Sequence, residues 1–248
     1  PMGQGFEHQY GHYAWGIDYY TKTIVHNAPA RFAVYDWHRN QQPIQEEGYA
    51  TDLIAAEAER VIASCERDDR PFFMYVAFNA VHGPLNPPPV FTGDPDDPLA
   101  IRDAMLSRLD QAVGRISRAI DEYGFRKNTL FIFTNDNGPF LSYGTHAGQS
   151  GALRGGKLTT FEGGVRVPTV ARWPGQIPAG HTCSTPIISF DFLPTFCHLA
   201  KAPLPRNTID GINIADVHEG KTNTVEGRDG LVFYAGSELQ AVRDGQWK

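Results

Sequence analysis

The sequence has 248 residues, 41% hydrophobic and 20% charged, so it can bury a core and is not a disordered tail. Its net charge of −6 argues against a general nucleic-acid binder, which usually carries a basic excess. No apolar run approaches the roughly 18 residues of a membrane span, and the three cysteines provide neither a disulfide scaffold nor a CxxC zinc pair.

The first predicted regular element is a helix at 51–66. Residues 1–50 are rich in glycine, histidine and aromatic side chains with little periodicity, which predicts loops and short irregular elements. In the helix, good helix formers accompany apolar residues at helical spacing from Leu53 to Ile62. The continuous apolar run at 72–78 then predicts a buried strand of a parallel sheet, and a proline-rich surface loop follows it.

The clearest predicted element is a second helix, because apolar residues recur every three or four positions from Ile101 to Ile120 and Gly124 suits the position just past its end. Another apolar strand follows within 129–138 and ends in a polar turn. Strand, long helix and strand make a βαβ unit, which predicts parallel pairing with a right-handed crossover. A further strand is expected within 165–173.

We therefore expect an α/β fold with a mostly parallel sheet flanked by helices. A helix within 188–200 has Pro194 in its first turn, and short β segments follow residue 205. The expected organisation is a partial catalytic domain at 1–205 and the start of a small, truncated, β-containing subdomain at 206–248. The last residues, AVRDGQWK, predict a hairpin with an Asp-Gly turn that stops early, so the sequence reads as a fragment of a longer protein.

Two predicted strands end in residues suited to chemistry, and ligands of open α/β sheets bind outside the carboxyl ends of strands. Asp136 and Asn137 offer hard oxygen ligands for Ca²⁺ or Mg²⁺, although Asp-Asn-Gly is equally a good turn sequence. His82 follows the strand at 72–78, where a catalytic role competes with a structural one. His146 lies on a glycine-rich loop and is either functional or merely solvated.

The stretch GALRGGKL resembles a nucleotide-binding P-loop, but Leu158 replaces the Ser or Thr that binds Mg²⁺ and no strand precedes the glycines. We reject that interpretation. Lys157 among glycines remains a compact cation that an anion can approach closely, the alternative being a surface lysine in a flexible loop. Glu162 and Arg166 are expected to form a buried ion pair, with substrate binding by Arg166 as the alternative.

Four stretches in this order resemble the sulfatase family of the alkaline-phosphatase-like superfamily: GYATDLIAAEAERVI, PFFMYVAFNAVHGPL, FTNDNGP and GALRGGKLTTFEGGVRVPTVARWPG. Weaker matches are SFDFLPTFCHLA, DGINI and AVRDGQWK. The segment DWHRNQQPIQEEGYATDL is most similar to the arylsulfatase-B-like branch. Each match is weak alone, but the ordered set spans nearly the whole chain.

The resemblance implies sulfate-ester hydrolysis and a role for each candidate residue. Asp136 and Asn137 match a pair of metal ligands, usually for Ca²⁺ and less commonly Mg²⁺. Lys157 matches a sulfate-binding lysine, and His82 a histidine near the leaving-group oxygen; His146 is a further candidate for substrate binding. A cation and Lys157 would stabilise charge on the sulfuryl oxygens, and a protonated His82 charge on the departing oxygen.

The family's nucleophile is a formylglycine made from a Cys or Ser in C/S-x-P-x-R, and this motif is absent here. Cys65, Cys183 and Cys197 all lack the required Pro and Arg. We expect the motif to lie in a missing N-terminal segment that also supplies strands of the sheet. The chain alone should then expose a hydrophobic strand edge and lack sulfatase activity.

Two other functions remain open at this stage: a phosphodiesterase or phosphonate hydrolase of the same superfamily, and a non-catalytic protein that binds sulfated glycans. The motif GGK-x-x-x-x-EGG-x-R favours the sulfatase. The expected substrate is a sulfated small molecule or glycan, without nucleic acid. The resemblance also implies a periplasmic or secreted protein, although PMGQGFEHQY is not a signal peptide.

Overall fold

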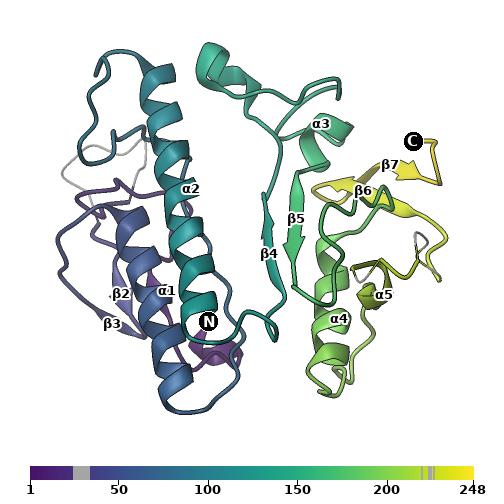
Figure 1. Cartoon of the computed structure of the whole chain (residues 1–248). Coiled ribbons are helices and arrows are strands. Elements are labelled where there is room, and N and C mark those ends of the chain that lie inside the picture. Colours follow the sequence, from purple (N-terminus) through teal and green to yellow (C-terminus); the bar gives the residue numbers. More distant parts are fainter. Residues whose placement is uncertain (25–33, 219, 223–224, 226) are drawn as a thin grey trace. The chain divides into compact units, whose positions relative to one another are not determined.

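The computed structural model describes all residues except 25–33, 219, 223, 224 and 226, and the chain divides into two units, Pro1–Arg126 and Lys127–Lys248 (Figure 1). Each unit contains helices and strands, as an α/β protein requires. None of the described helices combines the length and the apolar character needed to cross a bilayer. The predicted domain boundary near residue 205 stays a prediction.

Two long helices lie side by side in the first unit (Figure 1). The predicted helices are confirmed as α1 (Ala50–Arg67) and α2 (Pro98–Glu122). α2 begins where the Asp97 side chain accepts the Leu99 amide and ends at Glu122, two residues before Gly124, whose φ of 81° favours glycine. The apolar stripes meet between the helices, burying residues such as Ile62 and Met105.

The N-terminal residues fold into short elements, as predicted. They include a 3₁₀ helix, η1 (Met2–Gln4), and three two-residue strands: β1 (Tyr10–Gly11), β2 (His38–Arg39) and β3 (Gln42–Pro43). The strands form an antiparallel sheet in the order β1-β2-β3. Ile17, Tyr19 and Trp37 are fully buried in the core of this unit.

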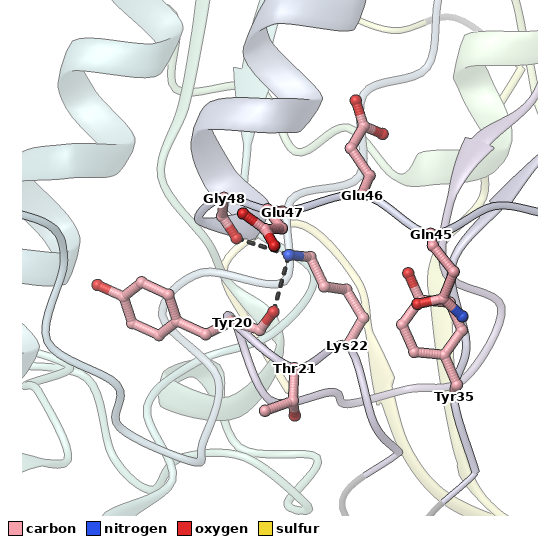
Figure 2. Close-up of a pocket in the computed structure, with 8 residues that line it drawn as sticks. All are labelled: Tyr20, Thr21, Lys22, Tyr35, Gln45, Glu46, Glu47 and Gly48. Atoms are coloured by element: carbon pink, nitrogen blue, oxygen red, sulfur yellow. Dashed lines mark hydrogen bonds between the residues drawn. The ribbon is translucent and has the colours of Figure 1, made fainter.

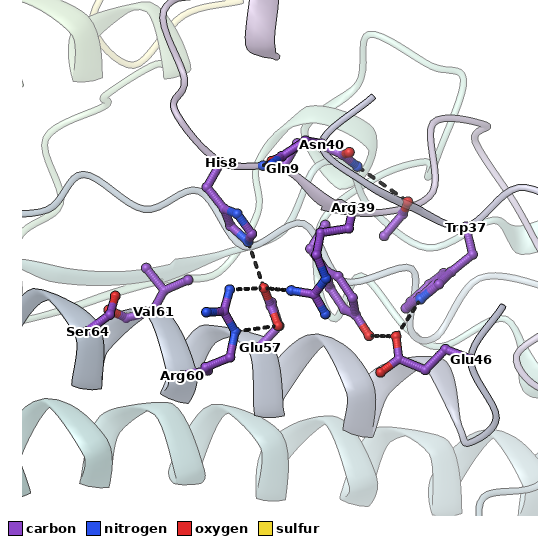
Figure 3. A network of polar contacts seen from close by, with 12 residues as sticks. His8, Gln9, Trp37, Arg39, Asn40, Glu46, Glu57, Arg60, Val61 and Ser64 are labelled. Carbon is purple, nitrogen blue, oxygen red and sulfur yellow. Dashed lines mark hydrogen bonds and ion pairs between the residues drawn. The ribbon is translucent and has the colours of Figure 1, made fainter. Parts of the chain in front are cut away.

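A polar network centred on Glu57 holds β2 and the N-terminal segment to α1 (Figure 3). The Glu57 carboxylate is buried, lies 2.7 Å from Nε2 of His8, and accepts hydrogen bonds from Arg39 and from Arg60. Burial alone would raise the pKa of Glu57, but the hydrogen bonds from Arg60 and Arg39 hold this pKa below its ordinary value. This network therefore depends on an ionised carboxylate.

The apolar segment at 72–78 differs from its prediction. It belongs to no ladder, and its side chains alternate between half-buried residues, such as Met74, and exposed ones. Phe73 is 63% and Tyr75 77% exposed. A β-ladder needs a hydrogen-bonding neighbour, and no described residue supplies one. The predicted βαβ pairing with 129–138 would join the two units and stays a prediction, and the strands described within each unit pair antiparallel.

The second unit begins with a confirmed strand, β4 (Phe131–Thr134), which pairs antiparallel with β5 (Thr169–Arg172). The register places Thr134 opposite Thr169, and their hydroxyl oxygens are 2.8 Å apart. Between the strands the chain forms a 3₁₀ helix, η3 (Leu141–His146), and one helical turn, α3 (Glu162–Val165). The loop that carries Asp136, Asn137, His146 and Lys157 therefore leaves β4 and returns as β5.

The C-terminal part of this unit confirms a helix followed by short β segments. The helix is η4 (Ser189–Asp191) continued by α4 (Phe192–Leu199), and a turn of helix, α5 (Ala215–His218), follows. The hairpin of β6 (Leu231–Ala235) and β7 (Glu238–Arg243) comes last. The predicted Asp-Gly turn also forms, because Asp244 and Trp247 exchange two backbone hydrogen bonds of 3.0 Å.

Candidate functional site

The loop after β4 carries Asp136, which is exposed, and Asn137, which is half-buried. The next residue, Gly138, donates its amide to the carbonyl of Gly164 at 3.0 Å. A Cβ atom at Gly138 would lie 1.8 Å from the carbonyl oxygen of Gly163, so only glycine fits here without a shift of the backbone. The Asp-Asn-Gly turn is thus fastened directly to α3.

The glycines around Lys157 allow the same close approach. The Lys157 amide donates to the carbonyl of Pro139 at 2.8 Å, and a Cβ atom at Gly156 would lie 2.3 Å from that carbonyl oxygen. The Gly163 amide donates to the carbonyl of Arg154 at 2.8 Å. Three backbone segments therefore pack against one another with almost no side chain between them, which explains the spacing GGK-x-x-x-x-EGG physically.

Lys157 stands at the centre of this packed loop with its side chain half-buried. Within the described part of the chain its ammonium group has no hydrogen bond or ion pair to a protein group. A lysine fixed at its backbone but unpaired at its charge is suited to binding an anion. We refer to residues 136–139, 154–157 and 162–164 as the glycine cradle.

Glu162 does not pair with Arg166, so the predicted ion pair is wrong. Its carboxylate accepts from Arg243 Nη1 at 2.7 Å and from Lys248 Nζ at 3.0 Å. Arg166 is exposed, and its backbone amide bonds to the Glu162 carbonyl. The reason is geometric, because the helical turn α3 directs the Glu162 carboxylate toward the C-terminal hairpin, where two cations meet it.

The charge of Glu162 is stabilised at this position. Partial burial opposes ionisation, but the hydrogen bond from Lys248 and the charges of Lys248 and Arg243 hold the pKa of Glu162 below its ordinary value. Arg154 adds a second restraint on the cradle, since its guanidinium lies 3.9 Å from the centre of the Phe161 ring. The cradle is therefore held from the hairpin side and from its own loop.

His146 lies at the end of η3, a few residues before the cradle. Its ring stacks on that of Tyr143, with centroids 5.3 Å apart and planes at 16°. Tyr143 in turn meets Phe140 edge to face. No contact joins His146 to Lys157 among the described residues, so its predicted role in substrate binding stays a prediction.

His82 belongs to the first unit, and its position is fixed there from several sides. Its Nδ1 atom lies 2.7 Å from the carbonyl oxygen of Gly83, which can only accept, so Nδ1 carries the proton. The Tyr19 hydroxyl is 3.0 Å from the His82 carbonyl and 2.8 Å from that of Asn79. Nε2 of His82 is therefore the ring nitrogen that remains to accept or release a proton.

The five predicted residues thus fall into two groups. Asp136, Asn137 and Lys157 are joined through the glycine cradle, with His146 on the adjoining 3₁₀ helix. His82 lies in the other unit.

The two candidate metal ligands, Asp136 and Asn137, have the right ligand chemistry, but a complete set of metal ligands is not seen around them among the described residues. Asp136 and Asn137 provide oxygen atoms, as a hard cation prefers, but such a cation takes six or more ligands. Among the described residues there is no cluster of three or more His, Cys, Asp or Glu side chains able to hold a metal. Two ligands alone do not make a metal centre.

Sequence reasoning missed the ion-pair partners of two carboxylates in the second unit, those of Asp191 and of Glu162. Asp191 is fully buried and accepts from the amides of Ile188 and Ile212 and from the guanidinium of Arg228. A charged residue inside the apolar run ISFDFLPTF was the available signal. The partners of Glu162 gave no local signal, because Arg243 lies 81 residues further along the chain.

An open pocket in the first unit is unrelated to the predicted site residues (Figure 2). It is lined by Tyr20–Lys22, Tyr35 and Gln45–Gly48. The Lys22 ammonium donates to the backbone carbonyls of Tyr20 at 2.8 Å and Gly48 at 2.6 Å. Burial lowers the pKa of Lys22, and its ammonium ties two loops together, which is a structural role.

Comparison with known proteins identifies relatives for most of the chain. The family model described as Sulfatase matches residues 2–202. The chain is 40% identical to arylsulfatase A of Homo sapiens over 201 residues, covering 78% of this chain and 38% of that protein. It is 32% identical to N-acetylgalactosamine-6-sulfatase of Canis lupus familiaris over 259 residues, covering 100% of this chain and 48% of that protein.

Comparison with solved structures also identifies proteins that are similar to this chain. The crystal structure of Ps i-CgsB in complex with k-i-k-neocarrahexaose superposes with a TM-score of 0.82 at 27% identity, covering 98% of this chain and 57% of that one. The chain spans less than half the length of the two curated relatives named above. The narrower resemblance to an arylsulfatase-B-like branch stays a prediction.

Proposed function

This chain belongs to the sulfatase family, with its alkaline-phosphatase-like α/β fold, and on that premise we propose that the polypeptide carrying it hydrolyses sulfate esters. The observation that carries the proposal is the glycine cradle. It fixes Lys157 by its backbone beside Pro139, two residues after Asn137, and leaves the ammonium unpaired among the described residues. A fixed, unpaired cation is suited to a sulfate group.

Lys157 has the role of binding a sulfuryl oxygen and stabilising the negative charge that builds there during S–O cleavage. Because the loop is already in place, the positive charge needs no reorganisation at the moment of reaction, which is the main source of electrostatic catalysis. Lysine suits this role better than a paired arginine, since its point charge serves one oxygen without demanding a planar partner. We assign His146 to the binding of the same substrate.

His82 has the role of general acid. Its Nδ1–H is held by the Gly83 carbonyl at 2.7 Å, so Nε2 is the ring nitrogen that can take up and release a proton. When the ring is protonated, Nε2 donates its proton to the oxygen of the departing alcohol, and that proton is recovered from water after the product leaves.

Sulfatases use a formylglycine nucleophile and a divalent metal. We propose Ca²⁺ for the metal, with Asp136 and Asn137 as two of its ligands, because both offer hard oxygen atoms. When bound, such a cation withdraws charge from the sulfate oxygens. The nucleophile would come from a C/S-x-P-x-R motif outside the printed sequence, which contains none.

The relatives and one structural neighbour support a proposal for the class of substrate. Arylsulfatase A and N-acetylgalactosamine-6-sulfatase are named for sulfate esters, and one structural neighbour holds an oligosaccharide. We propose a sulfated glycan or its fragments as the natural substrate of this protein. We also propose that the protein works in the periplasm or outside the cell, as the resemblance implies.

The test is an assay of the natural polypeptide that carries this chain, produced together with a formylglycine-generating enzyme. We expect turnover of 4-methylumbelliferyl sulfate, little turnover of the corresponding phosphate, and no activity of residues 1–248 alone. Efficient hydrolysis of the phosphate with inert sulfate would instead identify a phosphoryl-transfer enzyme and overturn the proposal.

A further inference from the structure

We propose that Leu158 and Leu141 form an apolar rim beside Lys157, and that this rim contacts the carbon skeleton to which the sulfate ester is attached. The inference rests on the proposed function, because it takes Lys157 as the sulfate-binding residue. It goes further in naming two specificity-determining residues and the chemical class that they favour, an alcohol with an apolar surface beside its ester oxygen. All three residues belong to the second unit.

Leu158 shares a tight turn with Lys157. The Thr159 amide donates to the carbonyl of Gly156 at 3.1 Å, and the Thr159 hydroxyl donates to the same oxygen at 2.7 Å. Lys157 and Leu158 are the two central residues of this turn, and adjacent Cα atoms are about 3.8 Å apart. The two side chains therefore leave the backbone at neighbouring points, so a ligand held by the lysine can reach the leucine.

The backbone of Leu158 is strained. Its φ of 71° lies in the left-handed region, which the third residue of such a turn ordinarily enters as glycine or asparagine. A leucine there is an outlier, because its Cβ atom crowds the following carbonyl oxygen. Backbone strain of this kind gathers at functional sites, where a side chain is kept in spite of its cost to the fold.

Packing does not compensate for this strain, because Leu158 is 84% exposed. Among the described residues, the other apolar side chain on a left-handed backbone is Val90, with a φ of 61° and 92% exposure. Val90 adjoins none of the candidate site residues along the chain, whereas Leu158 directly follows Lys157. The position beside a cation suited to sulfate is therefore what distinguishes Leu158.

A second exposed leucine lies on the other side of Lys157. Leu141 is the first residue of η3 and is 49% exposed. Its Cγ atom lies 2.8 Å from the point where a Cβ atom of Gly156 would stand, so the missing side chain at Gly156 makes room for it. Because Gly156 directly precedes Lys157, the lysine has Leu141 beside the preceding residue and Leu158 as the following one.

The rim suits the organic part of a sulfate ester. Such an ester has three oxygen atoms that share its charge and one that is bonded to carbon. When Lys157 binds a charged oxygen, the carbon part can lie against the leucines, which offer no hydrogen bond and bind by burying apolar surface. An aryl ring or the C–H face of a pyranose offers such a surface, and inorganic sulfate offers none. The rim therefore favours the ester over the sulfate product.

The test is kinetic, on the formylglycine-loaded natural polypeptide. Leu158→Asn replaces the leucine by a polar residue that tolerates the left-handed backbone. We expect KM for 4-methylumbelliferyl sulfate to rise about fivefold with little change in kcat, because apolar burial is lost equally from the bound ester and its transition state. The inhibition constant of inorganic sulfate should stay unchanged. Leu158→Met should keep KM near the wild-type value, since it remains apolar.

Two further variants control for the strain and the exposure. Leu141→Ala should raise the same KM in the same direction. Val90→Asn is the matched control, because it changes an exposed apolar residue on a left-handed backbone away from Lys157, and KM should not change. The Tm of Leu158→Asn should equal or exceed that of the wild type. A marked fall in this Tm would show that the fold needs the leucine, and would overturn the inference.

Sugar sulfates identify the surface that the rim contacts. Galactose 4-sulfate, galactose 6-sulfate and glucosamine 6-sulfate are the probes, each compared with 4-methylumbelliferyl sulfate. A rise in KM that Leu158→Asn causes for a sugar sulfate as well would assign the contact to the C–H face of a pyranose. A rise confined to the aryl sulfate would assign it to an aryl ring.

The two proposals fail in different ways. Turnover of sulfate esters with an unchanged KM in Leu158→Asn would overturn the rim and leave the sulfatase function intact. In a polypeptide that hydrolyses no sulfate ester, calorimetric titration would still measure binding. Weaker binding of 4-methylumbelliferyl sulfate by Leu158→Asn, with unchanged binding of inorganic sulfate, would support the rim and refute the hydrolase. An equal loss of affinity for both would show that Leu158 acts only through Lys157, and would overturn its role in specificity.

Discussion

The backbone amide of Lys157 donates to the carbonyl of Pro139 at 2.8 Å. This bond joins the loop that carries Asp136 and Asn137 to the loop that presents the lysine. It forms because Gly156 has no side chain, since a Cβ atom there would lie 2.3 Å from the same carbonyl oxygen. The metal-ligand candidates and the anion-binding candidate therefore move as one structural unit.

The first prediction concerns Gly138, whose missing side chain allows the turn to approach α3. Gly138→Ala should destabilise the second unit by about 1–3 kcal/mol, because a Cβ atom would meet the Gly163 carbonyl oxygen at 1.8 Å and force the backbone apart. Chemical denaturation monitored by circular dichroism measures the change. Gly3→Ala is the control, since no atom lies within 4 Å of its Cβ position. Equal stability of the two variants would refute the close approach.

The second prediction concerns the pH dependence of the Glu162 ion pairs. The pKa of Glu162 is lower in the folded state than its ordinary value of 4.5, so folding gains stability above that value and loses it as pH falls through the folded pKa. Glu162→Gln should cost about 1 kcal/mol at pH 7. The difference in folding stability between Glu162→Gln and the wild type should become smaller as the pH is lowered.

The measurement is Tm at pH 7 and at successively lower pH for both proteins. Glu238→Gln serves as control, because Glu238 is exposed on β7 and has no ion pair among the described residues. A gap between wild type and Glu162→Gln that stays constant down to strongly acidic pH would show that charge pairing with Arg243 and Lys248 is not its source.

The third prediction compares two glutamates on α1. Glu57→Gln should destabilise the first unit strongly, approaching the roughly 3–5 kcal/mol of a broken buried ion pair, because Arg39 and Arg60 lose their shared carboxylate (Figure 3). Glu59→Gln should cost less than about 1 kcal/mol, since its pair with Arg115 is partly exposed. Urea unfolding of both variants measures the contrast, and similar values would contradict the account.

The fourth prediction concerns the metal. Chelation of the active polypeptide with EGTA should abolish hydrolysis of an aryl sulfate, and Ca²⁺ should restore it. Asp136→Asn should raise the Ca²⁺ concentration needed for half-maximal activity at least about tenfold, since a ligand loses its charge. Asp229→Asn is the control outside the cradle. An unchanged Ca²⁺ requirement in Asp136→Asn would remove Asp136 from the metal site.

Local patterns in the sequence were sufficient for the helices, because their apolar stripes and end signals act over a few residues. The periodicity from Ile101 to Ile120 and the glycine after it predict α2 closely. The segment at 72–78 shows the limit of such patterns. Its composition predicts a strand, but a ladder also requires a neighbouring strand, and the described residues provide none.

The candidate site was predictable to a similar extent. The glycines around Lys157 predicted a position that an anion can approach closely, but not that Gly156 and Gly138 pack against the carbonyls of Pro139 and Gly163. The partners of Glu162 were not predictable, because nearby Arg166 was an equally plausible partner and Arg243 is distant in sequence.

The most direct test of the central claim is the effect of Lys157 on the hydrolysis of a sulfate ester. We would compare kcat/KM for 4-methylumbelliferyl sulfate in the formylglycine-loaded natural polypeptide and in its Lys157→Ala variant, with Lys127→Ala as control. The account predicts a loss of about 10²–10³-fold for Lys157→Ala, as for other preorganised charge-stabilising donors, and no change for Lys127→Ala. Unchanged turnover without the Lys157 ammonium would contradict the claim that the glycine cradle binds the sulfate.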